Sequence, residues 1–80
     1  MVHKNVAKIR EAKGVTKTHI ANALKMSLQG YRYLESGETT LGVERLKIIS
    51  SVLGVPVAVF FDDKLTESVV ECIEIEKEVS

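Results

Sequence analysis

Apolar side chains recur every three or four residues along most of this 80-residue chain, in short segments that each end near a glycine. This spacing places them on one face of an α-helix, whereas a strand would need strict alternation. Over residues 5–13 the pattern is carried by Val6, Ile9 and Ala12, and Gly14 then supplies a residue type that commonly terminates helices. The pattern predicts a first helix over residues 5–13 and an all-α fold.

Two further short helices are predicted directly after the first. Thr16 is a good N-cap for a helix that runs to about Leu24, and Ser27 is a good N-cap for the next helix. This next helix is expected to end at Gly37, because glycine adopts the left-handed conformation of a helix end without strain. Only a tight turn around residues 25–26 separates the second helix from the third.

The following segment predicts two more helices. Residues 43–53 carry apolar side chains at helical spacing, and Gly54 follows them. Pro56 then suits the first turn of a short fifth helix. The apolar side chains of this fifth helix are Val59, Phe60 and Phe61. Residues 1–62 are therefore expected to form one five-helix domain.

The remaining segment, residues 63–80, is an acidic tail that fits two kinds of secondary structure. The alternation over residues 73–76 and the density of β-branched side chains are typical of a strand. Leu65, Val69 and Cys72 also share one face of a helix. Both structures remain open for this tail, and its propensities favour the strand.

Charge is segregated along the chain, although its net charge is zero. Residues 1–61 contain nine Lys and Arg against four Glu, a net charge of +5, while residues 62–80 carry a net charge of −5. A basic body of this kind suggests a polyanion as the partner. A domain of this length is marginal alone, which favours association with a second subunit.

Several classes of protein are not expected. The N-terminus lacks the long apolar segment of a secretion signal and no run is long enough to span a membrane, so a cytoplasmic protein is expected. Cys72 has no second thiol for a disulfide or a metal site, and it is expected to fill apolar space. His3 and His19 have no Asp or Cys partner, and no phosphate-binding loop is present, so neither catalysis nor a cofactor or metal is predicted.

The second and third predicted helices together suggest DNA binding. Two short helices joined by a tight turn, with polar side chains on the outer face of the second, form a helix-turn-helix. The apolar residues that would hold the two helices together are Ile20, Leu24, Met26, Tyr31 and Leu34. In such a motif the second helix enters the major groove of DNA.

Four segments of the chain are each weak signals alone, but their order and spacing together are specific to one family of proteins. They are Ile9–Gly14, Thr16–Ala21, Tyr31–Gly37 and Leu46–Phe61. In these segments the chain resembles the phage-repressor (Cro/CI, or XRE-type) family of helix-turn-helix transcriptional regulators, over about residues 5–62. The resemblance implies a five-helix, lambda-repressor-like domain that binds a two-fold symmetric operator in double-stranded DNA as a dimer and acts as a repressor.

The resemblance also implies roles for individual residues. Arg10 and Glu35 match positions that form a partly buried ion pair between the first and third helices, for which the planar guanidinium is well suited. Lys17 matches a position at the start of the second helix that contacts phosphate. Lys25 stands where the family often has a left-handed glycine. Gly30, inside the reading helix, is expected to allow close approach of the backbone to DNA.

The third helix is expected to read DNA with the side chains that face away from its core side. The predicted base contacts are Ser27, Leu28, Gln29, Arg32 and Tyr33. Glutamine can pair with adenine, arginine with guanine, and leucine can contact a thymine methyl group. The predicted phosphate contacts are Lys17, Thr18, Lys25, Gly37, Thr39 and Thr40.

Apolar residues near the end of the chain predict a homodimer. The predicted interface residues are Val55, Val59, Phe60, Val69, Ile73 and Ile75. An unpaired strand in the tail would have open edges that a two-fold mate could fill. The alternative function is an antitoxin or antirepressor-type interaction module, which would keep the fold and use the tail to bind a partner protein.

Overall fold

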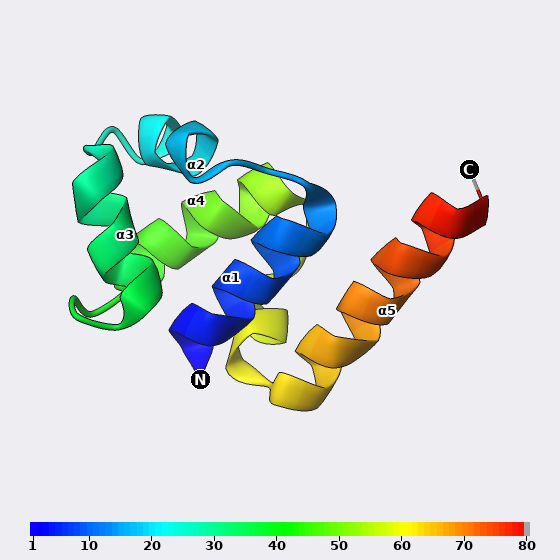
Figure 1. Ribbon diagram of the computed structural model, residues 1–80. Coiled ribbons are helices and arrows are strands. Elements are labelled where there is room, and N and C mark those ends of the chain that lie inside the picture. The colour runs from blue at the N-terminus through cyan, green and yellow to red at the C-terminus, as the bar shows by residue number, and fades with distance from the viewer. Residues whose placement is uncertain (80) are drawn as a thin grey trace.

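The computed structural model describes the backbone of residues 1–79 and the side chains of residues 1–77, and this part of the chain is helical without strands. Its elements are α1 (Val2–Lys13), α2 (Lys17–Ala23), α3 (Leu28–Ser36), α4 (Val43–Leu53), the 3-10 helix η1 (Val57–Phe61) and α5 (Asp63–Val79). In Figure 1, α2 and α3 form one end of the molecule and α5 lies beside α1 towards the other. The predicted all-α fold is confirmed. None of these helices combines the length and the apolar character that a membrane crossing requires.

Helix α1 begins at Val2, three residues before its predicted start, while the other helices up to residue 61 begin and end within one residue of the predicted positions. The Thr16 Oγ1 accepts a hydrogen bond from the His19 N–H at 3.1 Å. The Ser27 Oγ accepts one from the Gly30 N–H at 3.0 Å. These bonds satisfy N–H groups that have no partner within the helix. Gly14 ends α1 with a φ of 72°, a left-handed conformation that would strain any residue with a side chain.

The hydrophobic core lies where α1, α2, α3, α4 and η1 meet. Its fully buried apolar side chains are Val6, Ile9, Ile20, Tyr31, Leu34, Leu46, Ile49 and Phe60. Burial of one such side chain contributes about 1.5–3 kcal/mol, before the entropy of ordering is counted. Since the two buried residues of α3 are part of this core, the core fixes how α3 is presented to solvent.

The strand favoured for the tail is wrong, because residues 63–79 form the long helix α5. A strand in this place would have no other strand to pair with in the described part of the chain. A helix instead satisfies most of its backbone hydrogen bonds internally. Helix α5 packs against α1 and η1, and this packing buries Thr66 and Ile73. Tertiary packing therefore overrides the β-propensity of these residues.

A buried asparagine, Asn5, connects α1 to the start of α5. Its Nδ2 donates hydrogen bonds to the Phe60 carbonyl and to the Asp63 Oδ1, each at 2.9 Å. The amino group of Met1 lies 3.0 Å from the same Asp63 oxygen. The hydrogen bond from Asn5, and then the amino group of Met1, hold the pKa of the Asp63 carboxyl below its usual value. This cluster ties η1 and the first turn of α5 to α1.

Candidate nucleic-acid interface

Helices α2 and α3 form a compact unit at one end of the molecule (Figure 1). The fully buried side chains of the unit are Ile20, Ala21, Tyr31 and Leu34. Residues 24–27 join the two helices, and Leu24 and Met26 within this turn pack against the core. The unit has the geometry of a helix-turn-helix, with one face of α3 in the core and the other face in solvent.

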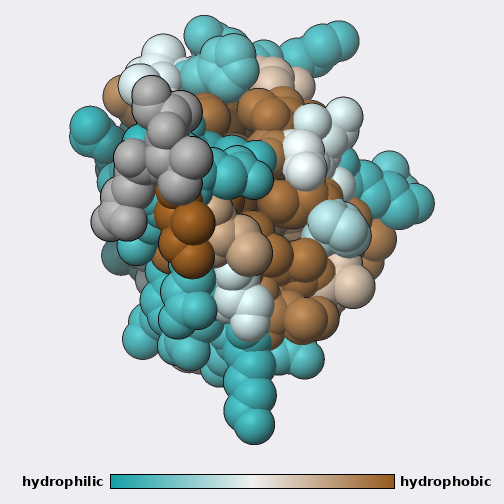
Figure 2. All heavy atoms as spheres, turned by 90° about the vertical axis from the view of Figure 1, so that its right-hand side faces the viewer, coloured by the Kyte–Doolittle hydropathy of each residue, from teal (hydrophilic) through white to brown (hydrophobic). Residues whose placement is uncertain are grey.

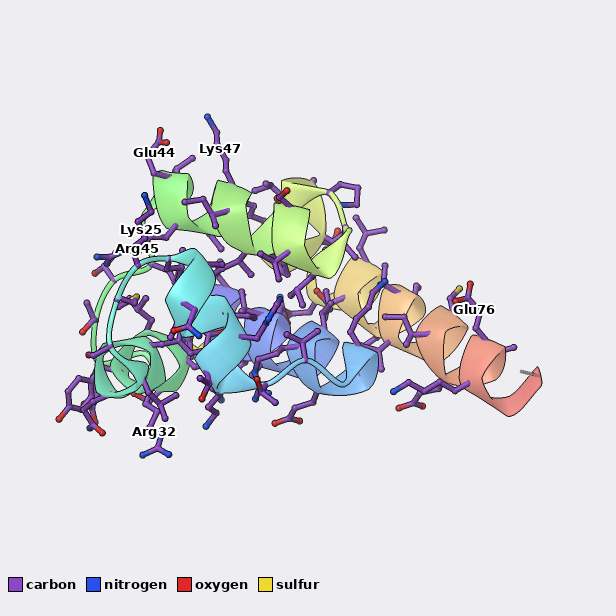
Figure 3. All side chains as sticks on the ribbon, turned by 90° about the horizontal axis from the view of Figure 1, so that it is seen from above. Lys25, Arg32, Glu44, Arg45, Lys47 and Glu76 are labelled. Carbon is purple, nitrogen blue, oxygen red and sulfur yellow. The ribbon has the colours of Figure 1, made fainter. Side chains whose placement is uncertain are left out.

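The outer face of α3 brings together three of the side chains predicted to contact bases. Gln29, Arg32 and Tyr33 are all exposed, and Arg32 extends away from the helix into solvent (Figure 3). Their amide, guanidinium and phenol groups can donate or accept hydrogen bonds at base edges. Leu28 is half-buried, and the Ser27 hydroxyl oxygen is already engaged in capping the helix. The first three residues are therefore the ones best placed to enter a groove.

Gly30 packs closely against the turn that precedes α3, and the approach of DNA to this glycine stays a prediction. A Cβ built on Gly30 would lie 3.0 Å from the Cε of Met26 and 3.2 Å from the Oγ of Ser27. The space beside Gly30 is thus filled by the turn that precedes α3. The absence of a side chain lets this turn close tightly on the helix.

The residues predicted to contact phosphate lie at several corners of the unit. Thr18 is exposed and Lys17 is half-buried in the first turn of α2. At the other end, Gly37, Thr39 and Thr40 are exposed in the loop that follows α3. These positions flank the outer face of α3 along the chain, as contacts to the two strands beside a groove would require.

His3 holds this loop and was not found from the sequence. A Cβ built on Gly37 would come within 2.8 Å of the His3 Nε2, so the imidazole ring lies directly against the glycine. Gly37 also has a φ of 86°, which favours glycine. Because His3 belongs to α1, the contact fixes the end of α3 against the first helix. No periodicity or motif marks His3 for this position.

Arg10 and Glu35 form a bidentate ion pair that joins α1 to α3. The Arg10 Nε and Nη2 each lie 2.9 Å from a different Glu35 carboxylate oxygen, and the two side chains are 8% and 7% exposed. Arg10 also donates a hydrogen bond to the Val15 carbonyl at 3.0 Å. Burial acts most strongly and raises the pKa of Glu35, but the hydrogen bonds and positive charge of Arg10, with smaller contributions from Tyr31 and Lys17, together outweigh it and the pKa lies below its usual value. The pair sets the orientation of α3 relative to α1.

Lys25 adopts a left-handed conformation, with a φ of 57°, in the turn between α2 and α3. Replacing Lys25 with glycine should raise the free energy of unfolding by about 1 kcal/mol, because the strain of a side chain in this conformation is removed. The same change should remove one phosphate contact, which reduces the slope of log binding constant against log salt concentration by about one. Urea unfolding and salt titration of binding measure the two effects.

A second variant separates strain from charge at this position. Lys25→Asn also removes the charge, and asparagine tolerates the left-handed conformation better than lysine does. Both variants should therefore lose the same salt dependence, while glycine gives the larger gain in stability. An unchanged salt dependence in both variants would show that Lys25 does not contact phosphate.

The residues predicted to form a dimer interface do not all reach the surface. Phe60 has no exposed surface, and Val59 and Ile73 are also buried within the chain. Phe60 is therefore a core residue, because the 3-10 geometry of η1 turns it inward, and it is not available to a partner. Val55 and Val69 are half-buried. Ile75 remains exposed.

The chain matches the model of one known protein family. A family model described as helix-turn-helix matches residues 6–60, which run from α1 to η1 and include the whole α2–α3 unit. Comparisons with curated proteins and with solved structures give no significant match. The matched region covers more than half of the chain. The chain therefore belongs to the helix-turn-helix family, in its XRE-type branch, and is a DNA-binding helix-turn-helix regulator.

Proposed function

We propose that this chain is a sequence-specific transcriptional repressor that binds a two-fold symmetric operator as a homodimer. Helix α3 lies in the major groove of double-stranded DNA, and the protein acts in the cytoplasm without catalytic activity. The observation that carries the proposal is the outer face of α3, where Gln29, Arg32 and Tyr33 are exposed together on a helix that the core holds in place. A protein bound over an operator represses by occupying the site that transcription needs.

The charge distribution supports the same assignment. The first 61 residues, which contain the α2–α3 unit, carry a net charge of +5. The acidic residues of the chain are concentrated from residue 62 onward, and α5 lies away from α3 in Figure 1. A basic body with its acids at the far end favours approach of the reading helix to the phosphate backbone.

Base reading and phosphate contact are distinguished by alanine variants on α3 and α2. Gln29→Ala and Arg32→Ala should each cost about 1–3 kcal/mol on the preferred operator and little on random DNA, because both side chains contact base edges. Lys17→Ala should weaken binding to all sequences alike and reduce the salt slope by about one. The operator is first found by selection of bound fragments from a random DNA pool, and affinities are then measured by fluorescence anisotropy.

Lys47 provides a matched control. It is an exposed cation that projects from α4, on the other side of the molecule from Arg32 (Figure 3). Lys47→Ala should leave both the affinity and the salt slope unchanged. If Lys17→Ala alters sequence preference while the two α3 variants leave it intact, then α3 is not the reading element.

An interaction module of the antitoxin or antirepressor type is the second candidate. The exposed apolar side chains of α5, Leu65 and Ile75, favour it, because such side chains on a small domain often bind another protein. Retention on heparin separates the two functions. A DNA-binding repressor should elute late and in a salt-dependent manner, whereas a pure interaction module has no reason to bind.

A further inference from the structure

The two sides of the molecule that flank α1 differ in how well they suit a polyanion. The side where α5 lies has apolar side chains gathered over its middle (Figure 2), and the acidic residues of the chain are concentrated from residue 62 onward. The first turn of α1 contains no acidic residue, and Lys4 and Lys8 are exposed along this helix. Helix α3 packs against α1, whereas no contact between described residues joins it to α5. The start of α1 is therefore the better placed of the two to add a contact with DNA.

The imidazole of His3 lines a hollow between the start of α1 and the loop that follows α3. The hollow has a volume of about 250 Å³, and its lining includes His3, Gly37, Thr39 and Thr40 together with apolar side chains of α1, α4 and η1. None of the described residues that line it is acidic. The lining therefore holds no carboxylate that would repel a phosphate. Because Thr39 and Thr40 are exposed, the hollow can be reached from solvent.

The polar side chains of this hollow are unpaired within the described part of the chain. No hydrogen bond joins the His3 imidazole, the Thr39 hydroxyl or the Thr40 hydroxyl to another described residue. The Nε2 of His3 faces the loop, because a Cβ built on Gly37 would come within 2.8 Å of it. An imidazole carries an N–H at Nε2 in one of its neutral tautomers and in its charged form. A donor and two hydroxyl groups thus stand ready at the loop that is predicted to contact phosphate.

Packing against Gly37 holds the His3 ring in place before any ligand binds. The ring carbons Cε1 and Cδ2 would lie 2.9 Å and 3.2 Å from a Cβ at position 37, so only glycine leaves room for the ring there. The side chain of His3 is half-buried as a result. A side chain that is already ordered loses less entropy on binding than a free surface lysine would.

We infer that the His3 Nε2–H donates a hydrogen bond to the DNA phosphate that the Thr39 and Thr40 hydroxyls contact. The first helix thereby supplies a contact with the DNA backbone in addition to those of the α2–α3 unit. Hydrogen bonds to a charged acceptor are stronger than those between neutral groups, and bonds to phosphate fix where a protein lies on the duplex. The inference rests on the proposed function, since it needs the loop after α3 to lie against the DNA backbone.

Two replacements of His3 separate hydrogen bonding from packing. His3→Gln keeps an N–H donor and should bind DNA within about threefold of the native affinity. His3→Phe keeps a flat ring against Gly37 but has no donor, and it should bind at least about tenfold more weakly. Fluorescence anisotropy should show the loss on random DNA as well as on the operator, because a phosphate contact carries no sequence information. A glutamine variant that binds no more tightly than the phenylalanine variant overturns the inference.

Operators with single neutral phosphates identify the contact. A methylphosphonate group, which lacks the phosphate charge, is placed at one position of the operator at a time. At one position it should weaken binding of the native protein and of His3→Gln at least about tenfold. At that position it should cost His3→Phe much less, because the donor is already missing. Equal costs for the native protein and His3→Phe at every position would show that no phosphate is coupled to His3.

Val70→Ala controls for an effect that acts through folding. Val70 on α5 is half-buried against the core and lines a different hollow, between α1 and α5. Its truncation should lower stability in urea unfolding and leave DNA affinity unchanged. If Val70→Ala weakens binding as much as His3→Phe does, then His3 acts only through stability and the inference is wrong.

Failure of this inference is distinguishable from failure of the proposed function. A native protein that selects no preferred sequence from a random DNA pool would contradict the proposed function, while binding to random DNA would still compare the His3 variants. A native protein that selects an operator, with His3→Phe binding it equally tightly, would contradict only the His3 contact.

Discussion

Replacing Glu35 with alanine should lower the free energy of unfolding by about 3–5 kcal/mol, the usual cost of removing one partner from a buried ion pair. Arg10 would keep only the Val15 carbonyl and a 3.4 Å contact with the exposed carboxylate of Glu11. Its guanidinium would then be a buried charge with too little compensation. For a domain of this size, each kcal/mol lowers the melting temperature by roughly 4–8 °C, which calorimetry resolves easily.

A double variant shows whether the loss comes from the orphaned charge. Arg10→Met combined with Glu35→Leu replaces the pair by apolar side chains, and such replacements are often neutral or stabilising. The double variant should therefore be more stable than Glu35→Ala alone. A cost below about 1 kcal/mol for Glu35→Ala would mean that the pair behaves like an exposed salt bridge.

Glu35 also contributes to the way in which the free energy of unfolding depends on pH in acid. The pKa of Glu35 in the folded protein lies below its ordinary value of 4.5. A carboxylate with a lowered pKa contributes stability that is present above its unfolded pKa and is lost as the pH falls through the folded pKa. Stability should therefore decline below about pH 4.5, and Glu35→Ala should show a shallower decline in urea unfolding measured across this range.

Helix positions in the body of the chain were predictable because their signals are local. Thr16 and Ser27 each bond an N–H three residues further on, and Gly14, Gly37 and Gly54 each end a helix in the left-handed conformation. Such residues act on their own turn of helix and depend little on the rest of the fold. The outer face of α3 was predictable for the same reason, because Tyr31 and Leu34 define its inner face.

The features that the sequence did not predict depend on distant residues. Propensity favoured a strand in the tail, whereas contact with α1 and η1 stabilises a helix there. His3 and Gly37 meet across 34 positions of sequence, and no pattern in either segment signals the contact. Phe60 looked available to a partner, yet its burial follows from how η1 folds back onto α1. The residue pattern therefore does not predict contacts between residues that are distant in the sequence.

Asn5 gives the sharpest test of such long-range packing. Asn5→Ala should cost about 2–3 kcal/mol, because the buried Phe60 carbonyl and the Asp63 carboxylate each lose a hydrogen-bond donor. Asn5→Asp has almost the same shape but cannot donate when ionised, and it places a second negative charge beside Asp63. Its cost at neutral pH should exceed that of alanine by at least about 1 kcal/mol.

The comparison of the two Asn5 variants tests whether the side chain stabilises the fold by donating hydrogen bonds or by filling space. If the amide acts as a donor that ties α5 to α1, then the isosteric aspartate must be the worse replacement in urea unfolding. The extra cost of aspartate should also shrink in acid, where a protonated carboxyl can donate to the Phe60 carbonyl again. An aspartate variant as stable as the alanine variant at neutral pH would show that Asn5 only fills space, and that apolar contacts alone hold α5 in place.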